Sequence, residues 1–306
     1  MVKFQSLFER GGLSLDRLRS FALIAEAGGL SRAAGGNPAR ISLFSRQLKE
    51  LEEFFGTALT GRQGRMVVLT EAGQQLAELA QATLLGLDDF QRACRGMQQT
   101  LGIAASNSVL EWMILPRAAE LRRALPSALL TFHSGRTQDL VHRLTDMTVD
   151  VGLLREDAVS APLKSKRLEV VGYSLFLPRQ FALPTREDRL KEALAEIPLA
   201  TSMGGQFREH LEVAARKTGW VLKIDISCSS FTQAARVVHT GTCAGILPDL
   251  AAVDFNPREV KQAALPFLKA YARPISVAWN PRLLQARPVA QRAVNALMSL
   301  LGPRSG

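Results

Sequence analysis

The sequence predicts an α/β protein with helices and a hairpin first, then one long helix, then a large region of mixed strands and helices. Three patterns lead to this fold class. Residues 38–55 carry a helical apolar stripe, a second such stripe of about 25 residues starts near residue 71, and strand and helix patterns alternate from about residue 101 onward. At 306 residues the chain is longer than one typical domain, so we expect two or three.

The composition favours a globular protein with a polyanionic partner. Apolar residues make up 47% of the chain, and the net charge is +10. The three cysteines, Cys94, Cys228 and Cys243, are far apart and form no CxxC pair, which indicates a reducing cytoplasm and no metal site. The residues after Met1 lack the pattern of a signal peptide, and no stretch of about 18 apolar residues occurs. We therefore expect a cytoplasmic protein without a membrane span.

Two helices are expected before residue 38. A helix over residues 15–27 follows Ser14, a favoured N-cap, and a short helix over residues 32–34 follows Ser31. Glycine pairs end both helices, and Pro38 follows the second pair. A helix, a short helix, a tight turn and a longer helix form the layout of a helix-turn-helix.

The helix over residues 38–55 has an unusual order of charges. Its basic and hydroxyl residues come first and its acidic residues last, which opposes the usual preference of the helix dipole. A recognition helix that presents its first half to DNA would have this order. Taken alone, the segment fits an ordinary amphipathic helix better, and its neighbours change that balance. Its apolar positions are Ile41, Phe44, Leu48, Leu51 and Phe55.

A basic hairpin is expected after this helix. Gly61 and Gly64 bracket a tight turn, and residues 66–69 form a β-prone run. Arg62 and Arg65 lie at the tip, where a wing would contact phosphates or the minor groove. A surface hairpin that is basic by chance is the alternative, but the preceding helical pair favours a wing.

At this point the chain resembles the LysR-type transcriptional regulators. The segments LDRLRSFALIAEAGGLSRAA, FSRQLKELEEFFGTAL and VVLTEAGQQL match the winged helix-turn-helix of that family in order and spacing, over about the first 75 residues. The chain departs from the family pattern at Arg40–Phe44, where a hydroxyl-rich entry to the recognition helix is usual, and at Leu59–Thr60, where Leu-Phe is usual. Asn37 and Pro38, with two glycines, replace an Ala/Leu-rich second helix. These departures concern the side chains that would meet bases.

A long helix is predicted over residues 71–97, with Thr70 as its N-cap. A single apolar seam of this length would be buried in an antiparallel pair between two subunits, and the resemblance implies the dimer-forming linker helix of the family. Packing against the second half of the chain is the alternative. Gly86 would permit a close helix approach or a bend, and Cys94 would pack as a small hydrophobe. The seam comprises Leu76, Leu79, Ala80, Thr83, Leu87, Phe90, Cys94 and Met97.

The remaining chain alternates between strands and helices, which implies a parallel sheet flanked by helices. Strands are expected at 101–106, 129–133, 149–154, 168–177, 197–202, 221–228, 243–247 and 274–279, and helices at 109–125, 138–145, 207–218, 231–240 and 288–301. LGIAASNS and FTQAARVVHTGTCAGILP resemble the effector-binding half of the same family, which is similar to type 2 periplasmic binding proteins. The resemblance implies two α/β subdomains joined by two crossover strands.

The predicted organisation has three parts. Residues 1–70 form the winged helix-turn-helix, 71–98 the linker helix, and 99–306 the effector-binding domain. The first subdomain is expected at about 101–163 with 268–302, and the second at about 164–267.

Polar turns follow four of the expected strands and predict a ligand cleft. Ligands of open α/β sheets bind beyond the carboxyl ends of strands, where helix N-termini suit an anionic group. Helix capping alone would explain each turn separately, but the set favours a cleft. The candidates for effector binding are Ser106, Asn107, Ser108, Gly135, Arg136, Met203, Gly204, Gln206, Ser230 and Thr232.

The sequence therefore predicts a DNA-binding transcriptional regulator, dimeric or tetrameric, that responds to a small, possibly anionic effector. The four histidines are scattered without ligand spacing, so we expect neither an enzyme nor a cofactor. A two-lobed solute-binding or enzymatic protein is the alternative, as is a regulator that has lost its ligand. The predicted DNA contacts are Arg32, Arg40, Ser42, Ser45, Arg46, Gln47, Lys49, Arg62 and Arg65.

Overall fold

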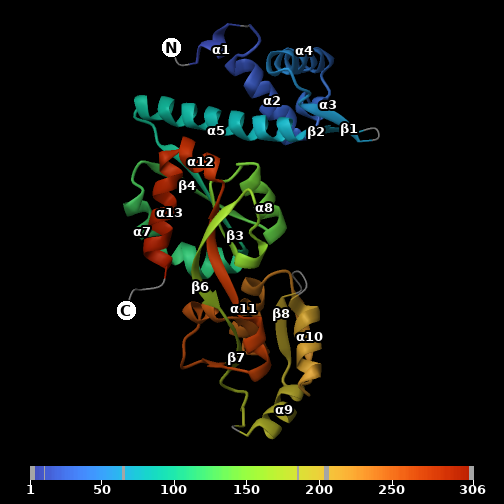
Figure 1. Ribbon diagram of the computed structural model, residues 1–306. Coiled ribbons are helices and arrows are strands. Elements are labelled where there is room, and N and C mark those ends of the chain that lie inside the picture. Colours follow the sequence, from blue (N-terminus) through green and yellow to red (C-terminus); the bar gives the residue numbers. More distant parts are fainter. Residues whose placement is uncertain (1–3, 10, 64–65, 185, 203–206, 303–306) are drawn as a thin grey trace.

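The computed structural model describes residues 4–9, 11–63, 66–184, 186–202 and 207–302. Four parts follow one another along the molecule (Figure 1). A helical domain lies at one end, the long helix α5 (Glu71–Cys94) crosses beneath it, and two α/β subdomains follow. In the part of the chain that is described, no helix combines the length and apolarity needed to span a membrane.

The N-terminal domain confirms the predicted winged helix-turn-helix. Ser14 Oγ accepts a hydrogen bond from the N–H of Arg17 (3.3 Å), and Asn37 Oδ1 accepts one from Arg40 (3.2 Å), so both main helices start with a side-chain cap. The core contains Phe21, Phe44 and Leu51, among others. The elements are α1 (Gln5–Phe8), α2 (Leu15–Ala27), α3 (Leu30–Ala33), α4 (Pro38–Phe55), β1 (Thr60–Gln63) and β2 (Met66–Leu69).

Two details of this domain differ from the prediction. Ser31 lies inside α3 and is not its N-cap. The N-cap is Gly29 at φ 148°, a backbone conformation that suits glycine. Gly61 lies in β1, paired with Val68, and so does not bracket the turn.

The first subdomain is built on a five-stranded sheet in the order β4-β3-β5-β12-β6. Helices α7 and α13 contribute to the core on one side of it, and α8 to the core on the other. Its strands are β3 (Gln99–Ala105), β4 (Ala128–Ser134), β5 (Val151–Arg155), β6 (Lys164–Val171) and β12 (Arg273–Trp279). Its helical segments are α6 (Asn107–Val109), η1 (Leu110–Ile114), η2 (Leu115–Arg117), α7 (Ala118–Ala124), α8 (Thr137–Thr145), η3 (Glu156–Ala158), α12 (Pro281–Ala286) and α13 (Pro288–Leu301).

The second subdomain has its own five-stranded sheet, in the order β11-β7-β10-β8-β9. Helices α9 and α10 contribute to one of its two apolar clusters and α11 to the other. Its strands are β7 (Tyr173–Pro178), β8 (Leu199–Ser202), β9 (Ile224–Cys228), β10 (Ala244–Pro248) and β11 (Val260–Ala263). Its helical segments are α9 (Glu187–Glu196), α10 (Phe207–Lys217), α11 (Phe231–His239), η4 (Asp249–Asp254) and η5 (Pro266–Tyr271).

The sheets correct the expected topology. Both are mixed, because β12 runs antiparallel to β5 and β6, and β7 runs antiparallel to β10 and β11. The strand expected at 168–177 is two strands in different sheets, β6 and β7, separated by Gly172. The first sheet therefore reaches Val171, beyond the boundary expected near residue 164. Where the chain returns to the first subdomain, η5 still packs in the apolar core of the second subdomain, and β12 begins at Arg273.

The helical stretch expected at 109–125 is interrupted. A π turn and a 3₁₀ turn that contains Pro116 separate α6 from α7, because proline lacks the N–H that a continuous helix requires. Helices α9 and α12 and strand β11 have no counterpart in the prediction.

Candidate nucleic-acid interface and effector cleft

Helix α4 presents the basic and hydroxyl side chains of its first half to solvent. Phe44, Leu48 and Leu51 are buried against the domain core, so the opposite face points outward. Five of the predicted DNA contacts are exposed on this helix: Arg40, Ser42, Ser45, Arg46 and Lys49. Of these, Arg46 and Lys49 form only loose ion pairs, at 4.0 Å with Glu50 and at 3.9 Å with Glu53. Both cations therefore stay available to an external anion.

The acidic second half of α4 makes structural contacts. Glu50 Oε2 binds Arg17 Nε of α2 at 2.5 Å, which joins the two helices. Glu52 Oε1 accepts the backbone N–H groups of Leu59 (2.9 Å) and Thr60 (3.2 Å), where the wing begins. The two halves of α4 therefore have different roles, which explains an order of charges that opposes the helix dipole. The acidic second half holds the domain together, and the basic first half stays exposed.

Gln47 and Arg32 differ from the exposed cations of α4 among the predicted DNA contacts. Gln47 is half-buried, and its Oε1 is buried without a hydrogen-bond partner among the described residues. Arg32 is exposed, but its Nη2 donates to the backbone carbonyl of Gly28 at the end of α2. Arg62 is exposed in β1 of the wing, and Arg65 lies outside the described residues.

The predicted effector residues of the first subdomain follow two adjacent parallel strands. Ser106, Asn107 and Ser108 come after β3, and Gly135 and Arg136 come after β4. The hydroxyls of Ser106 and Ser108 lie 3.3 Å apart, and the Ser106 side chain caps no backbone group. Capping therefore does not account for Ser106.

The residues of the second subdomain approach these turns. Ser230 caps α11 through the N–H of Gln233 (3.2 Å), and its Oγ lies 2.8 Å from Thr232 Oγ1. Helix α11 contacts α6, so the Ser106–Ser108 turn and the Ser230–Thr232 turn lie on neighbouring elements of the two subdomains. Met203, Gly204 and Gln206 fall outside the described residues.

An aromatic group beside these turns was not predicted. Tyr173 stacks on Phe207 with ring centroids 4.7 Å apart, and its ring lies 5.7 Å from that of Phe231, the residue between Ser230 and Thr232. Burial raises the pKa of Tyr173 to about 12, although the charges of Arg273 and Arg155 oppose the shift. Tyr173 follows Gly172 at the crossover between the sheets, a position that only the strand pairing reveals.

A second unpredicted contact joins the subdomains. Trp112 of the first subdomain is 2% exposed and packs in the second subdomain's apolar cluster, which also contains Phe255. Its indole N–H donates to Asp254 Oδ2 at 2.6 Å.

Two family models cover most of the chain. Residues 15–74 match the model described as "Bacterial regulatory helix-turn-helix protein, lysR family", and residues 95–302 match "LysR substrate binding domain". The chain belongs to the LysR family. It is a transcriptional regulator with a helix-turn-helix DNA-binding domain and an effector-binding domain, and the members it matches are regulators rather than enzymes.

Individual LysR relatives are distant in sequence. The regulator DgdR of Burkholderia cepacia is 27% identical over 259 residues, which span 80% of this chain and 83% of the relative. LysG of Corynebacterium glutamicum, solved at full length with bound effector Arg, has a TM-score of 0.61 at 18% identity and covers 95% of this chain and 100% of its own. Full-length CbnR, solved with its target DNA, has a TM-score of 0.54 at 20% identity and covers 94% and 99%. These structures share the fold with this chain.

Proposed function

We propose that α4 reads bases in the major groove and that the wing and flanking cations hold the phosphate backbone. The exposed first half of α4 supports this, because it carries two guanidinium and two hydroxyl groups. Among the described residues, the guanidinium of Arg46 has only a loose ion pair, and that of Arg40 lies over the Phe44 ring at 5.6 Å. Arg46 suits a bidentate contact with guanine, and Arg40, Ser42 and Ser45 extend the same face. Arg32, Lys49, Arg62 and Arg65 suit phosphate contacts. Gln47, whose oxygen is buried, would have to change rotamer to reach adenine.

A dimer would supply two such helices. The exposed apolar stripe of α5 supports pairing with a second copy, because Leu79, Leu87 and Phe90 are 58%, 45% and 69% exposed. Met97, which was predicted to continue this seam, lies beyond the end of α5 at Cys94 and is 51% exposed. The predicted seam is therefore divided, because Leu76 and Ala80 are buried in the chain itself. Cys94 is exposed rather than packed within the chain. We propose a homodimer through this stripe, with further association to a tetramer, acting in the cytoplasm.

The effector would bind where the polar turns of the two subdomains meet. The turns at Ser106–Ser108, Gly135–Arg136 and Ser230–Thr232 offer hydroxyls, a guanidinium and the N-terminal ends of α8 and α11, which suit a small anionic ligand. The residues Met203, Gly204 and Gln206 would complete this cleft. Tyr173 would add an aromatic wall beside Phe231.

Titration of promoter fragments over a salt series tests the DNA-binding site. We expect log K to fall linearly with log salt, because phosphate contacts release counterions. Arg46→Ala should lower affinity for the specific fragment by about fivefold to 150-fold, since a bidentate base contact provides about 1–3 kcal/mol. Arg123→Ala is the matched control, because Arg123 is an exposed arginine on α7, outside the winged helix-turn-helix. Equal affinities for the two variants would contradict the proposed site.

Isothermal titration with a panel of small carboxylates and amino acids tests the cleft. A ligand of this site should give saturable heat that weakens in Arg136→Ala and Ser230→Ala. Binding unaffected by both changes would place the effector elsewhere.

A further inference from the structure

The linker helix α5 has a second long face, which packs on the effector-binding domain of its own chain. Glu78, Ala82, Gly86 and Asp89 recur at helical spacing and lie on one side of α5. This side faces α12 and the residue after it, near the other end of the sequence. We call the pairing of these four residues with Arg282, Leu283, Ala286 and Arg287 the linker contact. On α5, the face of the linker contact is rotated by roughly 100° about the helix axis from the exposed apolar stripe that contains Leu79 and Phe90.

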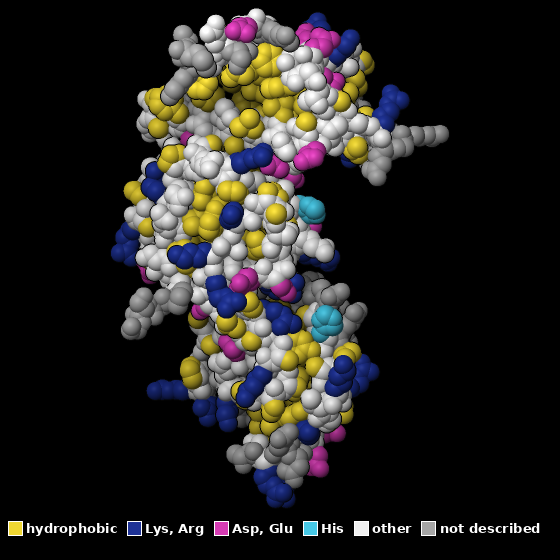
Figure 2. Space-filling model, in the orientation of Figure 1, with side chains coloured by type: hydrophobic (Ala, Val, Ile, Leu, Met, Phe, Trp, Pro, Cys, Tyr) yellow, Lys and Arg dark blue, Asp and Glu magenta, His cyan; other side chains and the backbone are white. Residues whose placement is uncertain are grey.

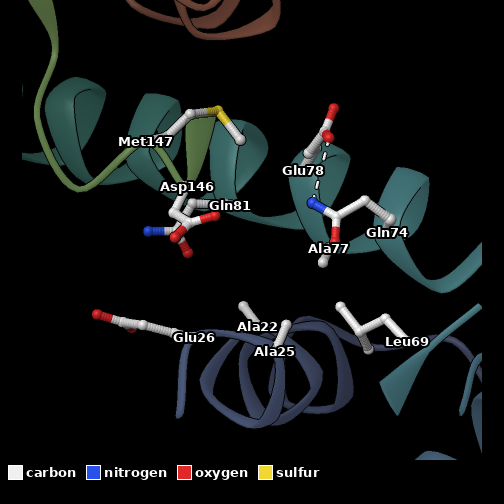
Figure 3. Close-up of a pocket in the computed structure, with 10 residues that line it drawn as sticks. All are labelled: Ala22, Ala25, Glu26, Leu69, Gln74, Ala77, Glu78, Gln81, Asp146 and Met147. Carbon is white, nitrogen blue, oxygen red and sulfur yellow. Dashed lines mark hydrogen bonds between the residues drawn. The ribbon is translucent and has the colours of Figure 1, made fainter. Parts of the chain in front are cut away.

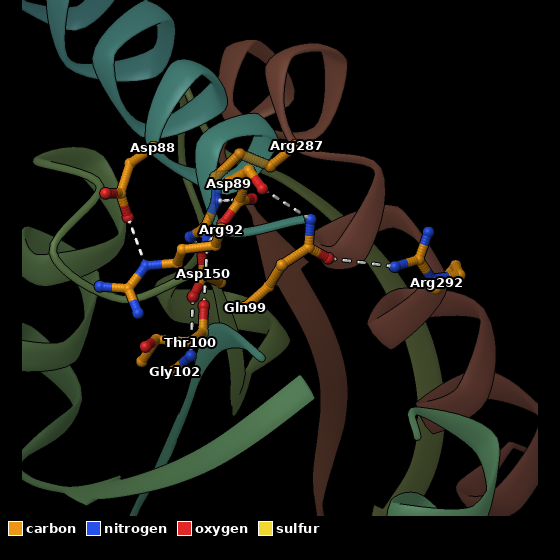
Figure 4. A network of polar contacts seen from close by, with 9 residues as sticks. All are labelled: Asp88, Asp89, Arg92, Gln99, Thr100, Gly102, Asp150, Arg287 and Arg292. Carbon is orange, nitrogen blue, oxygen red and sulfur yellow. Dashed lines mark hydrogen bonds and ion pairs between the residues drawn. The ribbon is translucent and has the colours of Figure 1, made fainter. Parts of the chain in front are cut away.

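The inner end of the linker contact is a buried ionic network (Figure 4). Arg287 donates from Nε and Nη2 to both carboxylate oxygens of Asp89, at 2.7 and 2.9 Å. Its Nη1 donates to Asp150, and its Nη2 also donates to the carbonyl of Thr100 at 2.7 Å. The side chains of Arg287, Asp89 and Asp150 are 6%, 4% and 7% exposed, so little solvent screens their charges.

This network attaches α5 to strand β3, which lies between β4 and β5 in the first sheet. Asp150 Oδ2 accepts the N–H of Gly102 on β3 at 2.6 Å, and Thr100 is on the same strand. The same strand ends immediately before Ser106, a predicted effector residue. The linker helix and one wall of the effector cleft are therefore connected through a single strand. Burial raises the pKa of Asp150, and the charge of Arg287 opposes this shift.

The outer end of the linker contact reaches the first turns of α5, where Leu76 and Ala77 pack in the core of the DNA-binding domain. Arg282 Nη1 binds Glu78 at 2.8 Å and donates to the carbonyl of Gln75 at 3.0 Å. Between the two ends, Ala82 packs with Leu283 and with Met147 from the turn after α8. Figure 3 shows a small pocket lined by residues of both domains, with Met147 against α5 and Asp146 between α5 and α2.

We infer that Arg287 is a positioning residue, which binds Asp89 and so holds α5 and the DNA-binding domain in a fixed orientation on the first subdomain. The linker, the DNA-binding domain and the first subdomain then move as one body. Effector binding can redirect this body only by moving the second subdomain or the partner copy against it. The effect on DNA binding rests on the proposed function, whereas the rigid attachment of α5 does not depend on it.

Hydrogen exchange on the full-length protein tests the rigidity without DNA. In the wild type, amides of residues 85–94 should exchange as slowly as those of β3. Asp89→Asn should speed their exchange at least tenfold, because one of the two charges of the bidentate pair is lost. Asp88→Asn is the matched control, since the neighbouring Asp88 is 52% exposed and, among the described residues, pairs only with Arg92 of its own helix. Asp89→Glu should restore part of the protection.

Paired half-sites test the positioning role. Duplexes selected from a random pool by the wild type would be compared as two-half-site and single-half-site fragments. Asp89→Asn should reduce the preference for the two-half-site fragment over the single-half-site fragment at least fivefold. The reason is that a mobile linker helix no longer fixes the distance between the two DNA-binding domains. A residue that contributed only to stability would leave this ratio unchanged.

Several results would overturn the inference. Fast exchange of α5 in the wild type would do so, and so would equal exchange in the Asp89 and Asp88 variants. An unchanged half-site ratio would remove the positioning role. If Asp89→Asn does not fold, Arg282→Met tests the outer end, where the arginine side chain is 40% exposed. If the protein binds no DNA but α5 still exchanges slowly, the proposed function is refuted, whereas the rigid attachment of α5 to the first subdomain is supported.

Discussion

Gly86 of the linker helix lies directly against the backbone carbonyl of Ala286. A Cβ built at residue 86 would lie 2.7 Å from that oxygen. A glycine inside a helix costs about 1 kcal/mol relative to alanine, so this position gives up helix stability for a close approach. The sequence suggested either a close approach or a bend, and the structure shows the approach.

Gly86→Ala should therefore destabilise the protein despite its better helix propensity. Overpacking of this kind costs about 1–3 kcal/mol, and a 2.7 Å contact with a backbone atom places the cost in the upper part of that range, above the gain of about 1 kcal/mol from alanine. The backbone oxygen cannot rotate away, so α5 and α12 must separate. Urea denaturation of the full chain measures the change in the free energy of unfolding. A variant about 1 kcal/mol more stable than the wild type would show that the helices do not touch here.

Glu52→Ala should destabilise the junction between α4 and the wing. The Glu52 carboxylate accepts two backbone N–H groups, and a partly buried donor left without its partner costs about 1–3 kcal/mol. Hydrogen exchange at Leu59 and Thr60 should rise together with this loss of stability. Glu53→Ala is the control, since Glu53 is 66% exposed and only 3.9 Å from Lys49, and it should change stability by less than about 0.5 kcal/mol.

Phe90→Asp should dissociate the proposed dimer. Phe90 is 69% exposed in the single chain, and burial of such a side chain contributes about 1.5–3 kcal/mol in each subunit. Analytical ultracentrifugation should show the dissociation constant rising at least tenfold. Gln91→Asp adds the same charge at the next residue, also exposed, and should leave the dimer intact if the apolar stripe forms the interface. Equal dissociation in both variants would indicate a general charge effect.

The phenol of Tyr173 should remain neutral until strongly alkaline pH. Its folded-state pKa of about 12 exceeds the ordinary value of 10.0, so the burial of the neutral ring stabilises the fold fully below about pH 10. That contribution should fall as the pH rises from about 10 to about 12. The chain has two tyrosines, so the Tyr271→Phe variant retains Tyr173 alone. Absorbance titration of this variant measures the pKa of Tyr173 directly. A midpoint near 10 would show that Tyr173 is open to solvent.

The sequence was sufficient where the structure is set by neighbours along the chain. The hydroxyls of Ser14 and Thr70 accept N–H groups three residues later, so a short pattern contains all that fixes these helix starts. The polar turns after β3 and β4 were likewise visible, because each follows a recognisable apolar strand. The same local signals predicted the exposed cations of α4.

Pairing between distant segments was decided by the tertiary structure alone. The split of one apolar run into β6 and β7 depends on β12, about 100 residues later, which draws β6 into the first sheet. Tyr173 enters the effector region only through that split. Neither effect has a local pattern, because sheet order results from long-range packing.

The linker helix shows both contributions. Its length, its N-cap and its apolar seam follow from helical periodicity, which local sequence encodes. Glu78 and Asp89 have the pattern of solvated helix positions, yet they bind Arg282 and Arg287 about 200 residues away. A charge on a helix is stable in water or beside an opposite charge, and only the folded chain decides which of the two surrounds it.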